Sequence, residues 1–272
     1  MSFAKINFFS KCLNMRTDVT VLLPEYPRQR EELNDYKRKY PEDLKFSAAY
    51  LLNGFTGDYT DWFSMIPMEY YSSITRIACV IPSGLNSWYE NIDGGLLMQK
   101  FIAEELPAYV EAVFPIMSDD EHRYIAGISM GGRGAAIISV KYAGRYNACA
   151  CLSAPLSMEG LFSSPEDLEP DRKLIQNSLR ACGIQRNANT DFYSAANRVL
   201  EMGKTLPDLF YAIGENDPLC EYEYDKIVAF IRQHSIKGTV KKIPGAKHDF
   251  DLWNPLAKEM MFWFYSKENN NG

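Results

Sequence analysis

The sequence predicts an α/β domain in which helices cover both faces of a mostly parallel sheet. Three observations support this prediction. Apolar runs of strand length alternate with longer segments whose apolar residues recur at helical spacing. A Gly-x-Ser-x-Gly motif stands where one apolar run passes directly into a helical segment. The length of 272 residues suits one domain with an insertion, because no linker interrupts the chain.

The elements can be assigned in chain order. The first two apolar segments are expected to form the antiparallel start of the sheet, and the charged, Pro-bounded stretch 26–43 is expected to be a surface loop. The strands are expected at 4–9, 17–23, 46–52, 77–81, 122–128, 147–152, 209–213 and 239–243. The helices are expected at 59–71, 95–114, 129–142, 222–234 and 255–265.

Residues 157–200 interrupt this alternation with charged, irregular and weakly helical sequence. We interpret them as a small, cap-like insertion over the carboxyl ends of the strands. In open α/β sheets, ligands bind at that end. The insertion belongs to a single domain that spans residues 1–272.

Composition and charge are those of an ordinary globular protein with a sizeable core, at 46% hydrophobic and 24% charged residues. The net charge of −6 comes from interspersed acids and bases, which argues against a nucleic-acid partner. No run is long enough to span a bilayer, and the N-terminus lacks the features of a signal peptide. Six cysteines without metal-like spacing favour a reducing cytoplasm. The oligomeric state stays open, and a homo-oligomer is one option.

The Gly-x-Ser-x-Gly motif predicts a nucleophile. Ser129 lies at the apex of a sharp turn from strand to helix, which is the nucleophile elbow of the α/β-hydrolase fold. Gly127 and Gly131 leave room for the close approach of strand and helix at such a strained turn. The backbone N–H of Met130, at the start of the helix, can donate to a developing oxyanion. The alternative is that these small residues form an ordinary packing turn.

Two later turns offer the partners that a serine nucleophile needs. Asp217 follows the last strand but one, and His248 follows the last strand. The chain order Ser, acid, His is that of the α/β-hydrolase fold. We therefore expect Ser129, Asp217 and His248 to form a catalytic triad. Glu215 is a rival acid, and an Asp after a strand is also a common turn former or helix N-cap.

The chain contains three histidines, and their positions single out one of them. His234 stands in a charged helix end and is expected to be solvated. His122 begins a strand and is therefore expected at the amino end of the sheet, opposite the site. His248 remains as the base that activates the serine hydroxyl, which is a poor nucleophile on its own at neutral pH.

A second oxyanion donor is expected in the loop after an early strand. Gly54 permits a turn after the strand at 46–52, and the N–H of Phe55 is the expected donor. The alternative is an ordinary loop at the end of a strand.

Three aromatic residues are candidates for the wall of a substrate pocket. Trp88 and Tyr89 lie in the loop after a neighbouring strand, and Trp253 follows His248 closely. Aromatic residues in loops also pack against their own domain, so both interpretations stay open.

With these residues assigned, the chain resembles the esterase family of α/β-hydrolases that includes esterase D (S-formylglutathione hydrolase) and the bacterial tributyrin esterases. The likeness extends from the first strands to His248. It is carried by Tyr124-Ile125-Ala126-Gly127-Ile128-Ser129-Met130-Gly131-Gly132, Ser87-Trp88-Tyr89, Gly214-Glu215-Asn216-Asp217 and Gly245-Ala246-Lys247-His248.

One departure from the family pattern concerns the loop before the oxyanion donor. Where the family usually reads Leu-Leu-His-Gly, this chain has Leu51-Leu52-Asn53-Gly54. That histidine is a supporting residue, and Asn53 is expected to form hydrogen bonds in its place. The loop is closer to the tributyrin esterase pattern than to that of S-formylglutathione hydrolase.

The resemblance implies cleavage of esters or thioesters of short acyl groups without a metal or cofactor, with Ser129, Asp217 and His248 in the triad positions. We expect a cytoplasmic serine carboxylesterase that hydrolyses short-chain acyl esters, such as acetyl esters, through an acyl-enzyme. Its partner is a small-molecule acyl ester, with no nucleic acid and no membrane. The alternatives are a thioesterase of the S-formylglutathione hydrolase type, an acyltransferase on the same scaffold, and a non-catalytic binding protein.

Overall fold

The computed structural model describes residues 2–25, 41, 43–157, 159–162, 170–184 and 191–268. Within these ranges, eight strands form one sheet in the order β1-β2-β4-β3-β5-β6-β7-β8. The six strands from β3 to β8 run parallel to one another, and β1 and β2 add an antiparallel hairpin at one edge. The predicted α/β architecture with a mostly parallel sheet is confirmed.

Every expected strand is present within two residues of its expected bounds. The strands are β1 (Ser2–Ser10), β2 (Met15–Leu23), β3 (Ala48–Leu52), β4 (Ala78–Pro82), β5 (Arg123–Ile128), β6 (Ala148–Leu152), β7 (Asp208–Gly214) and β8 (Gly238–Ile243). β3 to β6 are buried at every position, as expected for strands covered on both faces. The loop expected at 26–43 lies almost entirely outside the described residues.

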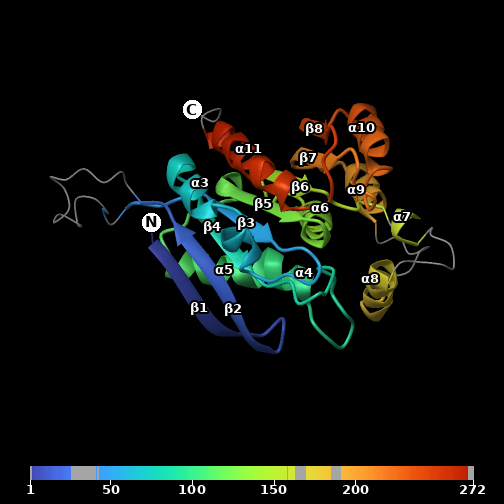
Figure 1. Ribbon diagram of the computed structural model, residues 1–272. Coiled ribbons are helices and arrows are strands. Elements are labelled where there is room, and N and C mark those ends of the chain that lie inside the picture. Colours follow the sequence, from blue (N-terminus) through green and yellow to red (C-terminus); the bar gives the residue numbers. More distant parts are fainter. Residues whose placement is uncertain are drawn as a thin grey trace.

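Helices cover both faces of this sheet (Figure 1). One face is covered by α2 (Asp61–Ser64), α3 (Met68–Thr75) and α11 (Phe250–Glu268). The other is covered by α4 (Met98–Lys100), α5 (Leu106–Val113), α6 (Met130–Lys141), α9 (Phe192–Glu201) and α10 (Glu223–His234). Successive residues of a strand point to opposite faces, so Tyr50 and Leu52 join one hydrophobic core while Ala49 and Leu51 join the other.

The two helices expected at 59–71 and 95–114 both differ from the prediction near a proline. Pro67 separates α2 from α3, because a proline disfavours helical conformation in the residue before it. In the second segment, the five residues Phe101–Glu105 form a π-helical turn between α4 and α5. Pro107 follows this turn, and the wider turn avoids the clash of its ring with the preceding carbonyl groups.

The last helix begins earlier than the sequence suggested. α11 starts at Phe250 and contains Pro255, which we had placed at its first residue. The carboxylate of Asp249 accepts a hydrogen bond of 3.3 Å from the N–H of Leu252, so this side chain caps the helix. Capping by Asp249 thus decides where the helix begins.

The segment between β6 and β7 contributes to two parts of the fold. α7 (Glu159–Phe162) and α8 (Pro170–Ala181) extend beyond the sheet on the right of Figure 1, whereas α9 packs on α6 and joins the core. The carboxylate of Glu223 accepts hydrogen bonds from the Ser157 N–H at 2.7 Å and the Tyr193 hydroxyl at 2.8 Å. One buried side chain therefore anchors both ends of the segment. Residues 163–169 and 185–190 of the expected insertion lie outside the described residues.

Two further observations concern the environment of the chain. Among the described helices, none has the length and apolar character needed to cross a lipid bilayer. All six cysteines are free thiols.

Candidate active site

The structure brings Ser129, His248 and Asp217 together at the carboxyl end of the sheet. The Oγ of Ser129 lies 2.9 Å from Nε2 of His248, and Nδ1 of His248 lies 2.8 Å from Oδ2 of Asp217. Each residue follows a different strand: Ser129 follows β5, Asp217 follows β7 and His248 follows β8. The chemistry-bearing side chains therefore converge because the ends of parallel strands lie at one edge.

We assign the tautomer of His248 from its two hydrogen-bond partners. An ionised carboxylate only accepts, so the proton between His248 and Asp217 belongs to Nδ1. Nε2 then carries a lone pair and accepts from the Ser129 hydroxyl. Asp217 is fully buried and Ser129 is 9% exposed, so the groups are shielded while the nucleophile remains reachable. This arrangement can remove a proton from Ser129 as its oxygen attacks an acyl carbon.

The backbone around Ser129 has the strained geometry of a nucleophile elbow. Its φ of 53° and ψ of −116° are unusual for a residue with a side chain. A Cβ on Gly127 would lie 2.1 Å from the carbonyl carbon of Gly131, and one on Gly131 would lie 2.3 Å from the carbonyl oxygen of Leu52. The glycines are required because strand and helix approach each other more closely than any side chain allows.

The segments that carry the two expected oxyanion donors both adjoin Ser129. α6 begins at Met130, and the first N–H groups of a helix have no carbonyl partner within the helix. A Cβ on Gly54 would lie 3.7 Å from Cβ of Ser129, which shows that the loop carrying Phe55 passes directly against the elbow. The loop and the helix start are thus placed to offer the Phe55 and Met130 N–H groups to one oxygen atom.

Asn53 holds the Phe55 loop from within the protein. Its buried amide donates to the carbonyl oxygens of Gly54 and Gly57, each at 2.8 Å. Its Oδ1 accepts from the Gly84 N–H at 2.8 Å and from the Tyr89 hydroxyl at 3.0 Å. The expectation that Asn53 forms supporting hydrogen bonds agrees with these contacts.

Two of the three aromatic candidates are buried within the domain. Tyr89 is 1% exposed, and its ring packs against Gly134 of α6, where an added Cβ would lie 2.5 Å away. Trp88 is 2% exposed and stacks on Phe55 with ring centroids 5.8 Å apart. Of the two interpretations left open, these contacts support packing within the domain, where both side chains hold the Phe55 loop.

The third aromatic candidate lies against His248. The ring of Trp253 meets the imidazole of His248 at 86° with centroids 5.0 Å apart. Its Nε1 donates to Oγ of Ser153 at 3.0 Å. Trp253 therefore restrains the imidazole on one side, whether or not it also touches a substrate.

Asp217 belongs to a tightly held turn. Its Oδ1 accepts from the Leu219 N–H at 3.0 Å, and the nearby Cys220 thiol donates to the Ser153 carbonyl oxygen at 3.1 Å.

The same turn raises the question of a metal site. The possible ligand atoms of Asp217, Cys220 and His248 all lie within 4.8 Å of one another, so this group could hold a metal ion. Burial raises the pKa of the Cys220 thiol well above its usual range, which disfavours the thiolate that a metal needs. A metal there would also replace the His248–Asp217 hydrogen bond.

A buried ion pair was not anticipated from the sequence. Arg133 of α6 is fully buried and donates to the Trp88 carbonyl oxygen at 3.0 Å and to Glu90 at 2.9 Å. It therefore ties the elbow helix to the loop that supports Phe55. An arginine among the glycines and alanines of α6 was a signal for this contact, since such a charge needs a partner when buried.

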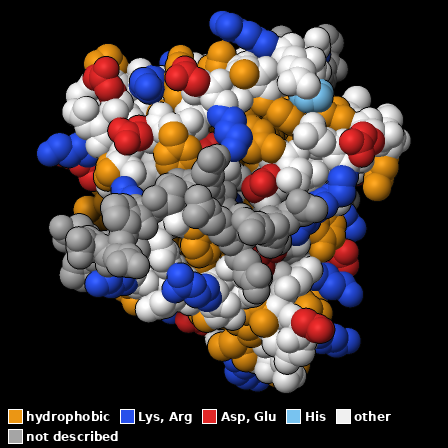
Figure 2. All heavy atoms as spheres, turned by 90° about the vertical axis from the view of Figure 1, so that its right-hand side faces the viewer, with side chains coloured by type: hydrophobic (Ala, Val, Ile, Leu, Met, Phe, Trp, Pro, Cys, Tyr) orange, Lys and Arg blue, Asp and Glu red, His pale blue; other side chains and the backbone are white. Residues whose placement is uncertain are grey.

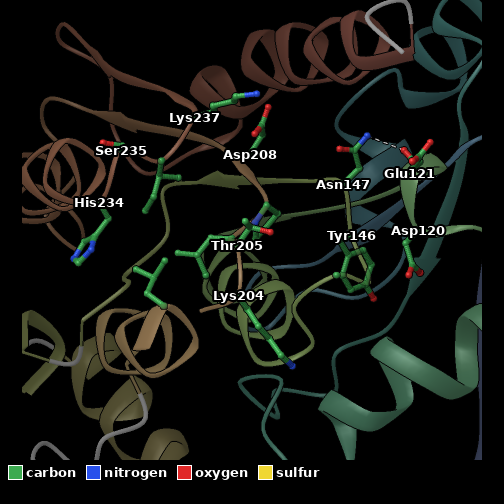
Figure 3. Close-up of a pocket in the computed structure, with 15 residues that line it drawn as sticks. Asp120, Glu121, Tyr146, Asn147, Lys204, Thr205, Asp208, His234, Ser235 and Lys237 are labelled. Atoms are coloured by element: carbon green, nitrogen blue, oxygen red, sulfur yellow. Dashed lines mark hydrogen bonds between the residues drawn. The ribbon is translucent and has the colours of Figure 1, made fainter. Parts of the chain in front are cut away.

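A hollow of about 510 Å³ lies at the opposite end of the sheet from Ser129 (Figure 3). It is bordered by the starts of β6, β7 and β8, and His234 and Lys204 line it. The centroid of the His234 ring lies 4.5 Å from that of the Phe230 ring. The third histidine, His122, has its Nδ1 atom 2.6 Å from Oδ1 of Asp119. No triad member is among the described residues lining this hollow, so the candidate site remains at Ser129.

Comparison with known proteins places the chain among esterases. The family model described as "Putative esterase" matches residues 10–255. The chain belongs to this family. It is 26% identical to an acetyl esterase of Caldicellulosiruptor saccharolyticus over 97% of this chain and 98% of that protein. The family assignment confirms the resemblance found in the sequence.

Solved structures show the same fold at lower sequence identity. The fluorophosphonate-binding serine hydrolase F of Staphylococcus aureus matches with a TM-score of 0.79 and 21% identity, covering 97% of this chain and 98% of that one. The S-formylglutathione hydrolase of Staphylococcus aureus matches with a TM-score of 0.78 and 20% identity, covering 97% and 100%. The predicted α/β-hydrolase fold is thus confirmed, and the esterase family makes the chain a carboxylic ester hydrolase.

Proposed function

We propose that the protein is a serine carboxylesterase that hydrolyses short-chain acyl esters, such as acetyl esters, through an acyl-enzyme. One observation carries this proposal: the continuous hydrogen-bonded chain from Ser129 through His248 to the buried carboxylate of Asp217. The proposal takes these three residues as the catalytic triad.

In the first half of the reaction, the Ser129 oxygen attacks the ester carbonyl while Nε2 of His248 takes the hydroxyl proton. Asp217 keeps the proton on Nδ1 and stabilises the imidazolium that forms. The carbonyl oxygen becomes an oxyanion, which the N–H groups of Phe55 and Met130 receive. His248 then returns its proton to the departing alcohol, leaving the acyl group on Ser129.

In the second half, water replaces the alcohol. His248 removes a proton from this water as it attacks the acyl-enzyme, and the same two N–H groups hold the second oxyanion. Collapse of this intermediate releases the carboxylic acid and returns the proton from His248 to Ser129. Each step uses groups of this chain together with the ester and water.

Two observations support a small-molecule ester as substrate. The curated relative that spans nearly the whole chain is named an acetyl esterase. Figure 2 shows that basic and acidic side chains are interspersed on the face that carries α7 and α8 in Figure 1, with no broad patch of one sign among the coloured atoms. This distribution favours a small-molecule partner over a nucleic acid.

The six free thiols support a reducing location such as the cytoplasm.

The second candidate is a thioesterase of the S-formylglutathione hydrolase type, favoured by the structural match to that enzyme. We would compare kcat/KM for p-nitrophenyl acetate, butyrate and octanoate with that for S-formylglutathione. We expect the acetate ester to be preferred over the longer chains and over the thioester. A strong preference for S-formylglutathione would overturn the choice, and added alcohols in the same assay would reveal acyl transfer.

A further inference from the structure

The loop that contains Trp88 holds the oxyanion loop at two neighbouring positions. The Oδ1 of Asn86 accepts from the Thr56 N–H at 2.7 Å. The Trp88 ring stacks on the Phe55 ring at an interplanar angle of 27°. The 85–89 loop therefore fixes the positions of both Phe55 and Thr56. The N–H that we assign to the oxyanion is that of Phe55.

This loop has an unusual backbone for which other contacts must compensate. Leu85, Asn86, Trp88 and Tyr89 all have φ between 51° and 54°, a region that residues with side chains seldom adopt. Such conformations persist only where surrounding contacts determine them. The question is which contacts hold the loop.

One of these contacts comes from α8. Ser178 of α8 is half-buried, and its Oγ accepts from Nε1 of Trp88 at 2.9 Å. The same hydroxyl donates to the Asn86 carbonyl oxygen in a longer hydrogen bond of 3.5 Å. A single hydroxyl group thus bridges the two residues that hold Thr56 and Phe55.

We propose that Ser178 is a positioning residue for the oxyanion hole, through which the docking of α8 fixes the place of the Phe55 N–H. This inference rests on the function proposed above. It gives α8 a part in the chemical step, beyond that of a wall beside the substrate. The coupling runs from Ser178 to Asn86 and Trp88, and from these to Thr56 and Phe55.

The proposal makes a kinetic prediction that a purely structural role does not make. An oxyanion donor binds the transition state more strongly than the bound ester, so its displacement lowers kcat and leaves KM nearly unchanged. Complete loss of a donor costs about 100-fold or more in kcat. A donor that is displaced but still present should cost less, and we expect a fall of about ten-fold for Ser178→Ala.

The test uses four single variants of the full chain, the Ser178→Ala/Trp88→Phe double variant, and p-nitrophenyl acetate. Ser178→Ala removes the bridging hydroxyl, and Ser178→Thr keeps it. Trp88→Phe removes the indole N–H while it keeps an aromatic ring over Phe55. Ser73→Ala is the matched control, because Ser73 is a half-buried serine on α3, on the other face of the sheet.

We expect kcat to fall about ten-fold in Ser178→Ala and in Trp88→Phe, with KM within two-fold of wild type. Ser178→Thr should recover most of kcat, Ser73→Ala should match wild type, and the double variant should be no worse than either single one. An unchanged kcat in Ser178→Ala, or a change confined to KM, would overturn the inference. Ser129→Ala tests the proposed function separately, since activity that survives it contradicts the triad and not the role of Ser178.

Discussion

Ser129 and His248 are 119 residues apart in the sequence, yet their side chains form a hydrogen bond of 2.9 Å. The parallel sheet explains this contact, because β5 and β8 deliver their following turns to the same edge. The contact also matters for reactivity. A serine hydroxyl is a weak nucleophile, and it becomes a strong one only where an imidazole is held close enough to remove its proton.

The first prediction concerns the choice of acid. Asp217→Asn should lower kcat by about 10⁴-fold with little change in KM, because an amide can donate to Nδ1 and favours the wrong tautomer of His248. Steady-state kinetics with p-nitrophenyl acetate would measure this change. Glu215→Gln is the control, since Glu215 is exposed and accepts from the Gly245 N–H. A greater loss in Glu215→Gln than in Asp217→Asn would show that the acid was assigned incorrectly.

The second prediction concerns Asn53. Asn53→Ala should lower the free energy of unfolding by about 3 kcal/mol, because the Gly84 N–H and the Tyr89 hydroxyl lose a buried acceptor. It should also lower kcat, since the Phe55 loop loses its internal support. Denaturant unfolding and kinetics would measure the two effects. Asn177→Ala, on the exposed surface of α8, should leave both near wild type; equal effects of the two substitutions would contradict this account.

The third prediction separates steric from conformational demands on glycine. Gly131→Ala should destabilise the fold by about 4 kcal/mol, because its Cβ would meet the Leu52 backbone oxygen at 2.3 Å. Gly144→Ala should cost only about 1 kcal/mol, since Gly144 has φ of 91° but nothing within 4 Å of an added Cβ. Thermal unfolding of both variants would compare them. Similar melting temperatures would mean that the elbow is less tightly packed than the structure shows.

The fourth prediction concerns pH and Asp61. Partial burial, with a smaller contribution from Asp58, raises the pKa of Asp61 to about 6 from 3.8. A raised pKa means that the folded state binds the proton more tightly, so stability is lost as pH rises from 3.8 to about 6. Asp61→Asn should therefore add about 1 kcal/mol at pH 8, after discounting for partial exposure.

This gain from Asp61→Asn should largely disappear near pH 4, because Asp61 is then protonated in the folded state and about half protonated in the unfolded chain. Thermal unfolding at the two pH values would measure it. Asp93→Asn, in an exposed loop, is the control for the removal of one negative charge. A gain for Asp61→Asn that is equal at pH 4 and pH 8 would argue against the raised pKa.

The elements that position the site were predictable because their signals are local. The apolar runs gave the strands, and the glycines around Ser129 marked a turn that only small residues permit. The order of Asp217 and His248 along the chain then placed both at the same edge. These arguments need only hydrophobic pattern, turn chemistry and the geometry of parallel strands.

The supporting contacts were not predictable because they depend on side-chain directions in three dimensions. For Tyr89 the sequence left a pocket wall and packing within the domain both open, and only its contact with Gly134 shows that it points into the core. The bridge from Ser178 to Trp88 joins residues 90 positions apart, with no motif to mark it. The earlier start of α11 followed from one capping contact of Asp249, which competed with the stronger signal of Pro255.

The central claim is that Ser129 forms the covalent acyl intermediate. The most direct measurement is peptide mapping by mass spectrometry after reaction with a fluorophosphonate probe, followed alongside ester hydrolysis. The account predicts one adduct, on Ser129, whose extent tracks the loss of activity, and neither adduct nor activity in a folded Ser129→Ala variant. An adduct on another residue that tracks the loss of activity, or hydrolysis near the wild-type rate in Ser129→Ala, would contradict it.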